Sequence, residues 1–204
     1  TPLSFQRRGI KGEVFIYMIE TSKYHATQTD LANEKVIVEA AKKDPSKFAS
    51  LYDKYYEQIF RYIYQRVDDK EQAFDATQQV FIKALESLHK YEFRGVPFAS
   101  WLYRIASSEV NNVYRAQKQR TVNIDSVGVY GVIEEIGETK IDQYHDKIVD
   151  IIGKELPEDE LQLIEMRFFE KRSFKEIGEI LEITENNAKV RTYRILEKLK
   201  KIIK

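Results

Sequence analysis

The chain has 204 residues, which is enough for one large domain or two small ones. Charged residues make up 32% of it, and Gly 8 and Pro 4 are low, a composition that favours helices over a turn-rich β fold. The formal net charge of +0 argues against a generic polyanion binder, and Cys 0 excludes disulfides and cysteine-ligated metals.

The start of the chain shows no sustained periodicity, and we expect residues 1–29 to form a poorly ordered tail or leader. The short apolar piece 14–19 lacks the cleavage site of a signal peptide, and Met18 is a candidate for the true start. No apolar run approaches the roughly 18 residues of a membrane span, so we expect no direct membrane insertion. The lack of cysteine fits a reducing cytoplasm, where we expect the protein to act.

Helical periodicity begins near Asp30 and predicts two helices in the first stretch. The first ends before Pro45, because a residue that precedes proline is disfavoured in the helical conformation. The second is longer and amphipathic, and it continues until Asp68 and Asp69 interrupt the pattern.

Two further helices complete a predicted domain over 30–120. The first spans about 70–88, and its apolar positions predict a buried face made of Phe74, Phe81, Leu85 and Leu88. The second opens at Pro97, which suits the first turn of a helix, and it has a candidate break at Ser107 and Ser108.

The stretch 121–140 lacks helical periodicity and contains three of the glycines, which predicts a flexible linker. Helical patterns resume near Ile141, stop at Pro157 and then continue towards the C-terminus. We therefore predict an all-α fold of two small helical domains, 30–120 and 141–204, joined by this linker.

Residues 173–200 have the pattern of two helices joined by a sharp turn. Ser173 and Glu176 fit a capping box on the first helix, and Thr184 can cap the second. One face of the second helix is expected to be buried: Ala188, Thr192, Ile195 and Leu199. A separate face is cationic and amide-bearing: Asn187, Arg191, Arg194 and Lys198. Such a pair is typical of a helix-turn-helix, whose second helix lies in the DNA major groove; the alternative is a solvated basic helix end.

A second candidate site lies between residues 90 and 120, where cations alternate with aromatic residues. The cations are Arg94, Arg104, Arg115, Lys118 and Arg120. The aromatic residues are Tyr91, Phe93, Phe98, Trp101, Tyr103 and Tyr114. Exposed rings beside cations suit single-stranded DNA, because cations meet phosphates and rings stack on unstacked bases. The alternative is a helical core with a basic rim, in which Phe98 and Trp101 are buried.

A third candidate is a polar stripe on the helix 72–88 that contains one apolar residue. It consists of Asp75, Gln79, Ile82 and Glu86, with Gln78 beside it. An exposed isoleucine in such a stripe indicates a protein-docking face, and the alternative is a solvated surface.

Four motifs in this order carry a family resemblance. They are D-x-x-Q-x-x-F (Asp75, Gln78, Phe81), F-R-G (93–95), W-L-Y-R-I-A (101–106) and A-K-x-R-x-x-R (188–194). With them, the chain from about Asp30 to Leu199, omitting the linker, resembles the bacterial RNA polymerase sigma factors of the extracytoplasmic-function (ECF) family.

The resemblance implies a division of labour. Four residues would dock on core RNA polymerase: Asp75, Gln78, Gln79 and Ile82. Ten would open and hold the −10 element of promoter DNA: Phe93, Arg94, Trp101, Arg104, Ser108, Asn111, Asn112, Arg115, Lys118 and Arg120. Seven would read the −35 element: Asn186, Asn187, Lys189, Arg191, Tyr193, Arg194 and Lys198. The linker would pass near the RNA exit path, an anti-sigma factor would be a further partner, and no cofactor is implied.

Four positions depart from the family pattern. Gln79 replaces a usual acid, and Ser108 replaces an asparagine that often helps form the base pocket. Glu182 stands where a turn glycine is common, so a left-handed backbone there would cost about 1 kcal/mol. Ala188 replaces a β-branched residue of the recognition helix.

Other classes of function fit less well. The three histidines, His25, His89 and His145, have no metal-ligand spacing, and no phosphate-binding or nucleophile motif appears, so we do not expect an enzyme. A stand-alone helix-turn-helix regulator would need a dimer interface that the pattern does not indicate. An adaptor that binds polymerase without melting DNA is the third alternative.

Overall fold

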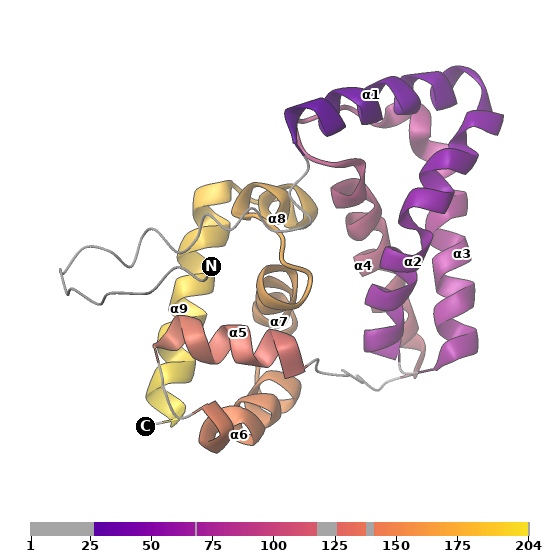
Figure 1. The fold of residues 1–204 in the computed structure, drawn as a ribbon. Coiled ribbons are helices and arrows are strands. Elements are labelled where there is room, and N and C mark those ends of the chain that lie inside the picture. Colours follow the sequence, from indigo (N-terminus) through magenta and orange to yellow (C-terminus); the bar gives the residue numbers. More distant parts are fainter. Residues whose placement is uncertain (1–26, 68, 118–125, 138–140, 204) are drawn as a thin grey trace, which may run out of the picture.

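The computed structural model describes residues 27–67, 69–117, 126–137 and 141–203, and within these ranges the regular structure is entirely helical (Figure 1). The N-terminal part contains α1 (Gln28–Lys43), η3 (Pro45–Phe48), α2 (Ala49–Val67), α3 (Lys70–Ser87), η4 (Leu88–Lys90) and α4 (Phe98–Gln117). The C-terminal part contains α5 (Ser126–Ile136), α6 (Ile141–Lys154), α7 (Glu158–Ile164), η5 (Glu165–Phe169), α8 (Phe174–Leu181) and α9 (Glu185–Ile203).

The first described helix begins earlier than expected. Thr27 and Asp30 form a capping box, with the Asp30 amide donating to Thr27 Oγ1 over 3.1 Å, so α1 already starts at Gln28. The predicted tail is therefore wrong for residues 27–29, and its remainder, 1–26, lies outside the described residues.

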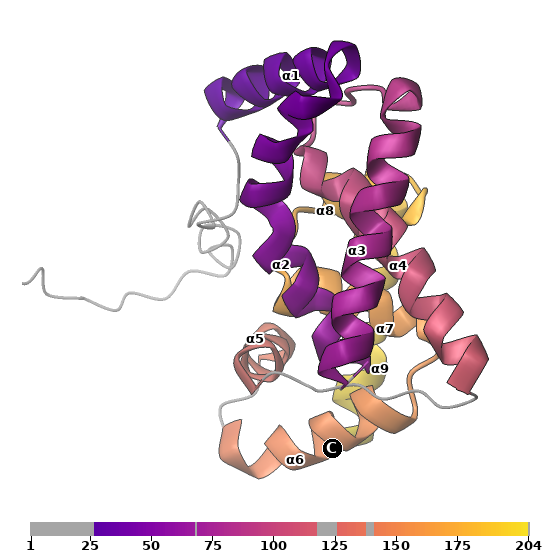
Figure 2. The same ribbon diagram turned by 90° about the vertical axis from the view of Figure 1, so that its right-hand side faces the viewer.

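In the N-terminal domain, α2, α3 and α4 lie side by side and α1 crosses one end of the bundle (Figures 1 and 2). The carboxylate of Glu34 on α1 is buried at this crossing. It accepts hydrogen bonds from the Phe98 amide at 2.5 Å, Lys54 Nζ at 2.7 Å and the Tyr55 hydroxyl. Because the first amides of a helix lack partners within the helix, Glu34 both caps α4 and fixes its direction.

The predicted break at Ser107 and Ser108 is wrong, since α4 continues from Phe98 to Gln117. Ser107 Oγ lies 2.8 Å from the Tyr62 hydroxyl of α2, so this polar residue has a partner in the neighbouring helix. An uninterrupted α4 presents one long face to solvent.

The buried face of α3 also differs from the predicted one. Phe81 and Leu88 are 3% and 2% exposed as expected, but Phe74 is 49% and Leu85 39% exposed. Small residues between α3 and its neighbours, such as Ala73 and Ala84, let the helices approach closely and turn the two larger side chains outwards.

The segment predicted as a linker contains a helix, so the expectation of a non-helical connection is wrong for residues 126–136. The buried side chains of α5 recur at helical spacing: Val129, Val132, Ile133 and Ile136. They pack α5 against α6, η5 and α9 of the C-terminal domain. At Gly128 an added Cβ would lie 1.6 Å from Phe169 Cδ1, so glycine permits this close approach. The remainder of the predicted linker, 121–125 and 138–140, lies outside the described residues.

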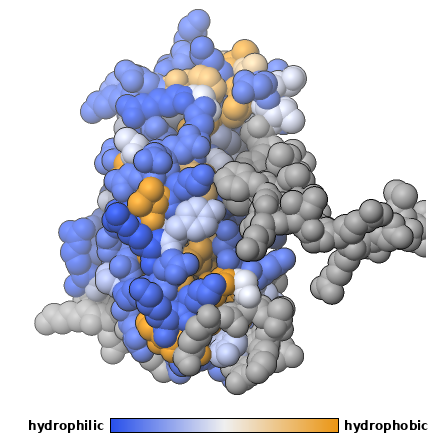
Figure 3. All heavy atoms as spheres, turned by 90° about the vertical axis from the view of Figure 1, so that its left-hand side faces the viewer, coloured by the Kyte–Doolittle hydropathy of each residue, from blue (hydrophilic) through white to orange (hydrophobic). Residues whose placement is uncertain are grey.

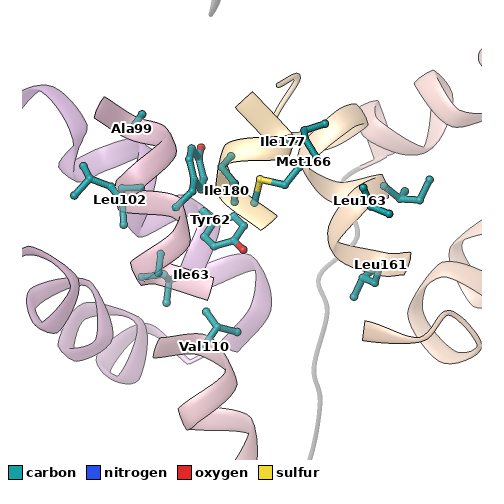
Figure 4. Packing of buried hydrophobic residues seen from close by; sticks show 14 of the residues in the cluster. Tyr62, Ile63, Ala99, Leu102, Val110, Leu161, Leu163, Met166, Ile177 and Ile180 are labelled. Carbon is teal, nitrogen blue, oxygen red and sulfur yellow. The ribbon is translucent and has the colours of Figure 1, made fainter. Parts of the chain in front are cut away.

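The two domains are in contact through α4 and α8, and their buried apolar residues form one continuous cluster. Figure 4 shows Tyr62 of the first domain beside Ile180 of the second. The structure therefore places the predicted −10 helix directly against the helix-turn-helix.

Candidate nucleic-acid interface

The helix-turn-helix is assembled from α8 and α9 by local contacts. The predicted capping box is confirmed, with the Glu176 amide donating to Ser173 Oγ over 3.2 Å and the Ser173 amide donating to Glu176 Oε2 over 2.9 Å. Thr184 caps α9 as predicted, since its Oγ1 accepts from the Asn187 amide at 3.1 Å. The turn itself contains Glu182 with φ 56° and ψ 40°, the left-handed conformation that its sequence position suggested.

Gly178 is a turn residue that sequence reasoning missed. A Cβ at this position would lie 2.8 Å from the carbonyl oxygen of Ile183, so only glycine lets α8 approach the turn this closely. The sequence offered one signal for this turn residue, a glycine five positions after the capping serine Ser173.

The predicted buried stripe of α9 is confirmed: Ala188, Thr192, Ile195 and Leu199 are buried. The predicted −35 residues lie on the rest of the helix, where most are exposed: Asn186, Asn187, Lys189, Tyr193, Arg194 and Lys198. This face of the molecule is largely hydrophilic with separate hydrophobic patches (Figure 3). A groove of about 780 Å³ runs along it beside Val190, Tyr193 and Ile202.

Two predicted −35 cations form ion pairs with α7. Arg191 pairs with Asp159, and Lys198 Nζ lies 2.9 Å from Glu160 Oε2. Among the described residues, no carboxylate lies within ion-pair distance of Arg194, although Glu185 and Glu197 lie on the same helix.

Tyr193 is held from two sides. Burial raises the pKa of the Tyr193 hydroxyl. The negative charge of Glu135 on α5 and a hydrogen bond to its carboxylate act in the same direction, whereas Arg167 lowers that pKa. Its ring centroid lies 6.2 Å from that of Phe174. Helix α5 therefore helps to orient a residue of the recognition helix.

The −10 candidates divide into supporting and exposed residues. Phe98 is fully buried and Trp101 half-buried, with its ring centroid 5.1 Å from that of Tyr91 and 5.3 Å from that of Phe98. The alternative of a helical core therefore holds for Phe98 and in part for Trp101. The half-buried or exposed remainder is Phe93, Arg94, Arg104, Ser108, Asn111, Asn112 and Arg115. Lys118 and Arg120 lie outside the described residues.

The exposed α4 positions form one stripe. Arg104, Ser108, Asn112 and Arg115 follow one another at steps of three or four residues, so they share a helix face. A hollow of about 540 Å³ lies at its beginning, between α3 and α4, with Lys83, Lys90 and Glu86 on its opposite wall. Amide, hydroxyl and cationic groups along one face can contact both the bases and the phosphates of a DNA strand.

On α3, three of the polymerase-docking candidates, Asp75, Gln79 and Ile82, are exposed. Gln78 is half-buried and donates a hydrogen bond to the Tyr52 hydroxyl over 3.2 Å. The unexpectedly exposed residues Phe74 and Leu85 extend this surface, which makes it more apolar than the sequence indicated.

A set of polar contacts between the domains was not foreseen from the sequence. Arg66 pairs with Glu165 in a buried position, and the Tyr103 hydroxyl donates to Glu170. Arg172 lies over the Tyr103 ring, 5.0 Å from its centroid. These residues are far apart in the sequence, and periodicity carries no signal for such pairs.

In the described part of the chain, no His, Cys, Asp or Glu residues gather into a group that could hold a metal. Within the same residues, no helix is both long enough and apolar enough to cross a membrane.

Known proteins match both domains. The family model of sigma-70 region 2 matches residues 51–120, and that of sigma-70 region 4 matches residues 154–201. The RNA polymerase sigma factor SigV of Bacillus subtilis (strain 168) is 30% identical over 139 residues, which cover 68% of this chain and 80% of SigV. The ECF RNA polymerase sigma factor SigW of the same strain is 27% identical over 180 residues, covering 82% of this chain and 95% of SigW.

A solved structure has the same fold. CnrH in complex with the cytosolic domain of CnrY superposes with a TM-score of 0.55 at 17% sequence identity, over 83% of this chain and 96% of that one. Together, the two matched regions, their order along the chain and the similarity to SigV and SigW show that this chain belongs to the ECF family of RNA polymerase sigma factors, non-enzymatic initiation factors that direct the polymerase to promoters.

Proposed function

We propose that three surfaces divide the promoter-directing work of this sigma factor. The exposed face of α3 docks on core RNA polymerase, the stripe of α4 with the preceding loop holds the melted −10 element, and α9 reads the −35 element as duplex DNA. The observation that carries this proposal is the continuous α4 stripe from Arg104 to Arg115, which ends in a cation and is exposed at Ser108, Asn112 and Arg115.

The α4 stripe suits a single strand better than a duplex. Arg115 offers a charge to phosphates, while Ser108 and Asn112 offer hydrogen bonds to the edges of unpaired bases. Trp101 is packed between Tyr91 and Phe98, so we assign it to supporting the face rather than to stacking on a base across its whole ring.

Helix α9 supports duplex reading, because its exposed side chains stand opposite a buried stripe. Asn187 lies in the first turn of the helix, where the backbone amides also attract a phosphate. Arg194, one turn beyond Arg191, has the planar donor group that pairs with guanine in the major groove.

We also propose an anti-sigma factor as a partner and the cytoplasm as the place of action. The related fold of CnrH was solved in complex with the cytosolic domain of CnrY, which supports a protein partner for this chain as well. Transcription initiation takes place where polymerase and chromosome meet, and that requirement places a bacterial sigma factor in the cytoplasm.

Run-off transcription with core RNA polymerase on a library of promoter fragments tests this proposal. Transcripts should start only when both proteins are present, and permanganate should detect unpaired thymines in the −10 element. Replacing Asn112 and Arg115 together by alanine should reduce that reactivity at unchanged polymerase binding. The matched control is alanine at Asp53 and Glu57, which are exposed on α2. Unchanged promoter opening in the Asn112 and Arg115 variant would contradict the α4 assignment.

A further inference from the structure

The loop 91–97 (the −10 loop) joins η4 to α4 and carries two of the residues that we assign to the −10 element. Phe93 is half-buried and Arg94 is exposed, whereas Val96 and Pro97 at the end of the loop are buried. The residues of this loop are neither helix nor strand. Its conformation therefore depends on contacts with the elements around it, because it lacks the repeating hydrogen bonds of regular structure.

Helix α1 contacts the −10 loop at its start. Lys42 Nζ donates to the carbonyl oxygen of Tyr91 over 2.8 Å and lies 5.9 Å from the centroid of the Tyr91 ring. The same ammonium group lies 2.8 Å from Glu39 Oε1, and the Lys42 side chain is only 20% exposed. Lys42 is thus held in place and fixes the point at which the chain leaves η4.

The same helix contacts the middle and the end of the loop. Lys35 Nζ lies 5.6 Å from the centroid of the Phe93 ring. The carboxylate of Glu34 accepts from the Phe98 amide, the first of α4, over 2.5 Å. With Lys42, these residues attach α1 to the loop at three points.

The buried charge of Glu34 indicates that this attachment specifies a position. A buried carboxylate is costly unless it is compensated, and an apolar residue would fill the same space at lower cost. Glu34 finds its donors on two elements, Lys54 and Tyr55 on α2 and Phe98 on α4. A hydrogen bond depends on direction, which an apolar contact does not, so these donors fix where α4 begins.

We propose that α1 positions the −10 loop through Glu34, Lys35 and Lys42. These residues set the conformation in which Phe93 and Arg94 meet the melted strand. The inference rests on the proposed function of α4 and its preceding loop, and it adds the residues that govern selectivity there. A contact that is already in place discriminates best, so a loop released from α1 should accept more −10 sequences and open each of them less efficiently.

Trp101, the single tryptophan of the chain, reports on the −10 loop in the whole protein. Its ring centroid lies 5.1 Å from that of Tyr91 at the start of the loop and 5.3 Å from that of Phe98 at its end. Lys42→Met removes the donor to the Tyr91 carbonyl and should raise the quenching of Trp101 fluorescence by acrylamide at least about twofold, through local opening. Lys43→Met removes the same charge from an exposed neighbour and should leave the quenching unchanged.

Holoenzyme with core RNA polymerase tests the consequence on promoters that differ by single bases in the −10 element. For Lys42→Met, permanganate reactivity on the preferred promoter should fall about fivefold, as for the loss of one hydrogen bond of ordinary strength. The preference over the single-base variants should shrink, while the rank order of −35 variants stays the same. Lys42→Arg keeps the charge and the donors and should restore both properties, and Lys43→Met should act like the wild type.

The ratios between promoters separate positioning from stability. A variant that is partly unfolded lowers opening on all promoters by one factor and leaves their ratios unchanged. Glu34→Gln keeps the shape of the side chain, removes its charge and should reduce the −10 preference as Lys42→Met does. If Glu34→Gln does not fold, the Lys42 variants decide, because Lys42 is partly exposed and accessible to water.

Unchanged Trp101 quenching in Lys42→Met would overturn the attachment of the loop, and unchanged ratios between −10 variants would overturn its role in selectivity. An equal effect of Lys43→Met would reduce the result to net charge and would also overturn the inference. The proposed function is judged separately by the variant with Asn112 and Arg115 replaced. If that variant fails to open promoters while Lys42→Met behaves like the wild type, the α4 assignment stands and only the positioning by α1 is wrong.

Discussion

Arg66 on α2 and Glu165 on η5 form an ion pair that is buried between the two domains, with side chains only 3% and 4% exposed. Burial alone would lower the pKa of Arg66, but Glu165 and the neighbouring tyrosines outweigh it and hold that pKa above its ordinary value. The guanidinium also lies over the Tyr62 ring, 3.7 Å from its centroid. Each charge therefore depends on the other for compensation in a site without access to water.

Removing one member of this pair should destabilise the protein more than removing both. Glu165→Gln leaves the Arg66 charge uncompensated and should lower the free energy of unfolding by about 3 kcal/mol. Replacing Arg66 and Glu165 together by methionine should recover most of that loss, since an apolar pair of similar volume avoids the desolvation cost. Urea denaturation measures both, and a double variant as unstable as the single one would contradict this account.

Stability should fall in alkaline solution because of buried tyrosines. Burial raises the pKa of Tyr62 to about 12, with Arg66 acting in the opposite direction, and burial also raises the pKa of Tyr103, as does the nearby Glu170. The unfolded chain loses these protons near pH 10, so above that value it binds fewer protons than the folded one. Stability present below pH 10 should decline between about pH 10 and 12, by up to about 1.4 kcal/mol per pH unit for each tyrosine.

Urea unfolding at a series of pH values, with tyrosinate absorbance as the probe of ionisation, checks this dependence. Tyr62→Phe should make the decline shallower, because one of the shifted groups is gone. The prediction fails if the free energy of unfolding stays level across that range.

Two glycines of α5 should respond oppositely to alanine. At Gly128 the new Cβ would overlap the Phe169 ring, and we expect a loss of about 1–3 kcal/mol from overpacking. At Gly131 the nearest atom, Phe168 Cδ1, lies 3.5 Å away, so alanine fits and should add up to about 1 kcal/mol through helix propensity. Thermal unfolding and hydrogen exchange of the α5 amides distinguish the two alanine variants. Equal changes in stability for both variants would show that α5 is not packed as described.

Charge reversal on α3 should weaken holoenzyme assembly without unfolding the protein. Asp75→Lys places a cation on the proposed docking face, and Asp75 is exposed, so the melting temperature should stay within about 2 °C. Affinity for core RNA polymerase should drop at least about tenfold, because the reversed charge no longer complements the polymerase surface that Asp75 is proposed to contact. Asp53→Lys on α2 is the matched control, and loss of binding in both variants would remove the case for a specific α3 face.

The two arginines of α9 should have different roles. Arg191 is half-buried and paired with Asp159, which restricts its reach, whereas Arg194 is exposed. Arg194→Ala should cost about 1–3 kcal/mol of discrimination at one −35 base pair, and Arg191→Ala should weaken binding to all sequences alike. Transcription from single-base −35 variants, repeated at several salt concentrations, measures both; the same rank order of promoters in wild type and Arg194→Ala would refute base reading.

The sequence alone determined those features whose interacting residues lie within one or two helical turns of each other. The capping box of Ser173 and Glu176, the Thr184 cap and the buried stripe of α9 all depend on spacings of three or four residues, which the helix geometry alone places together. The order of the motifs likewise sufficed to indicate the two domains and the family.

Tertiary structure decided which face of a helix is buried and whether a weak pattern folds. Phe74 and Leu85 fit an apolar stripe, yet they are exposed because small residues of α3 occupy the contacts with α2 and α4. Helix α5 contains glycines that lower helix propensity, and it folds because Val129, Val132 and Ile133 are buried against elements distant in sequence.

The contact between the two domains is the feature that the sequence indicated least. Arg66 and Glu165 are 99 positions apart, and Arg104 and Glu182 are 78 apart. A charged side chain carries no periodic signal for its partner, because the free energy of an ion pair depends on burial and on the geometry of both groups. These quantities exist only once the helices of both domains have packed, and so the tertiary structure alone determined that the proposed −10 surface meets the helix-turn-helix.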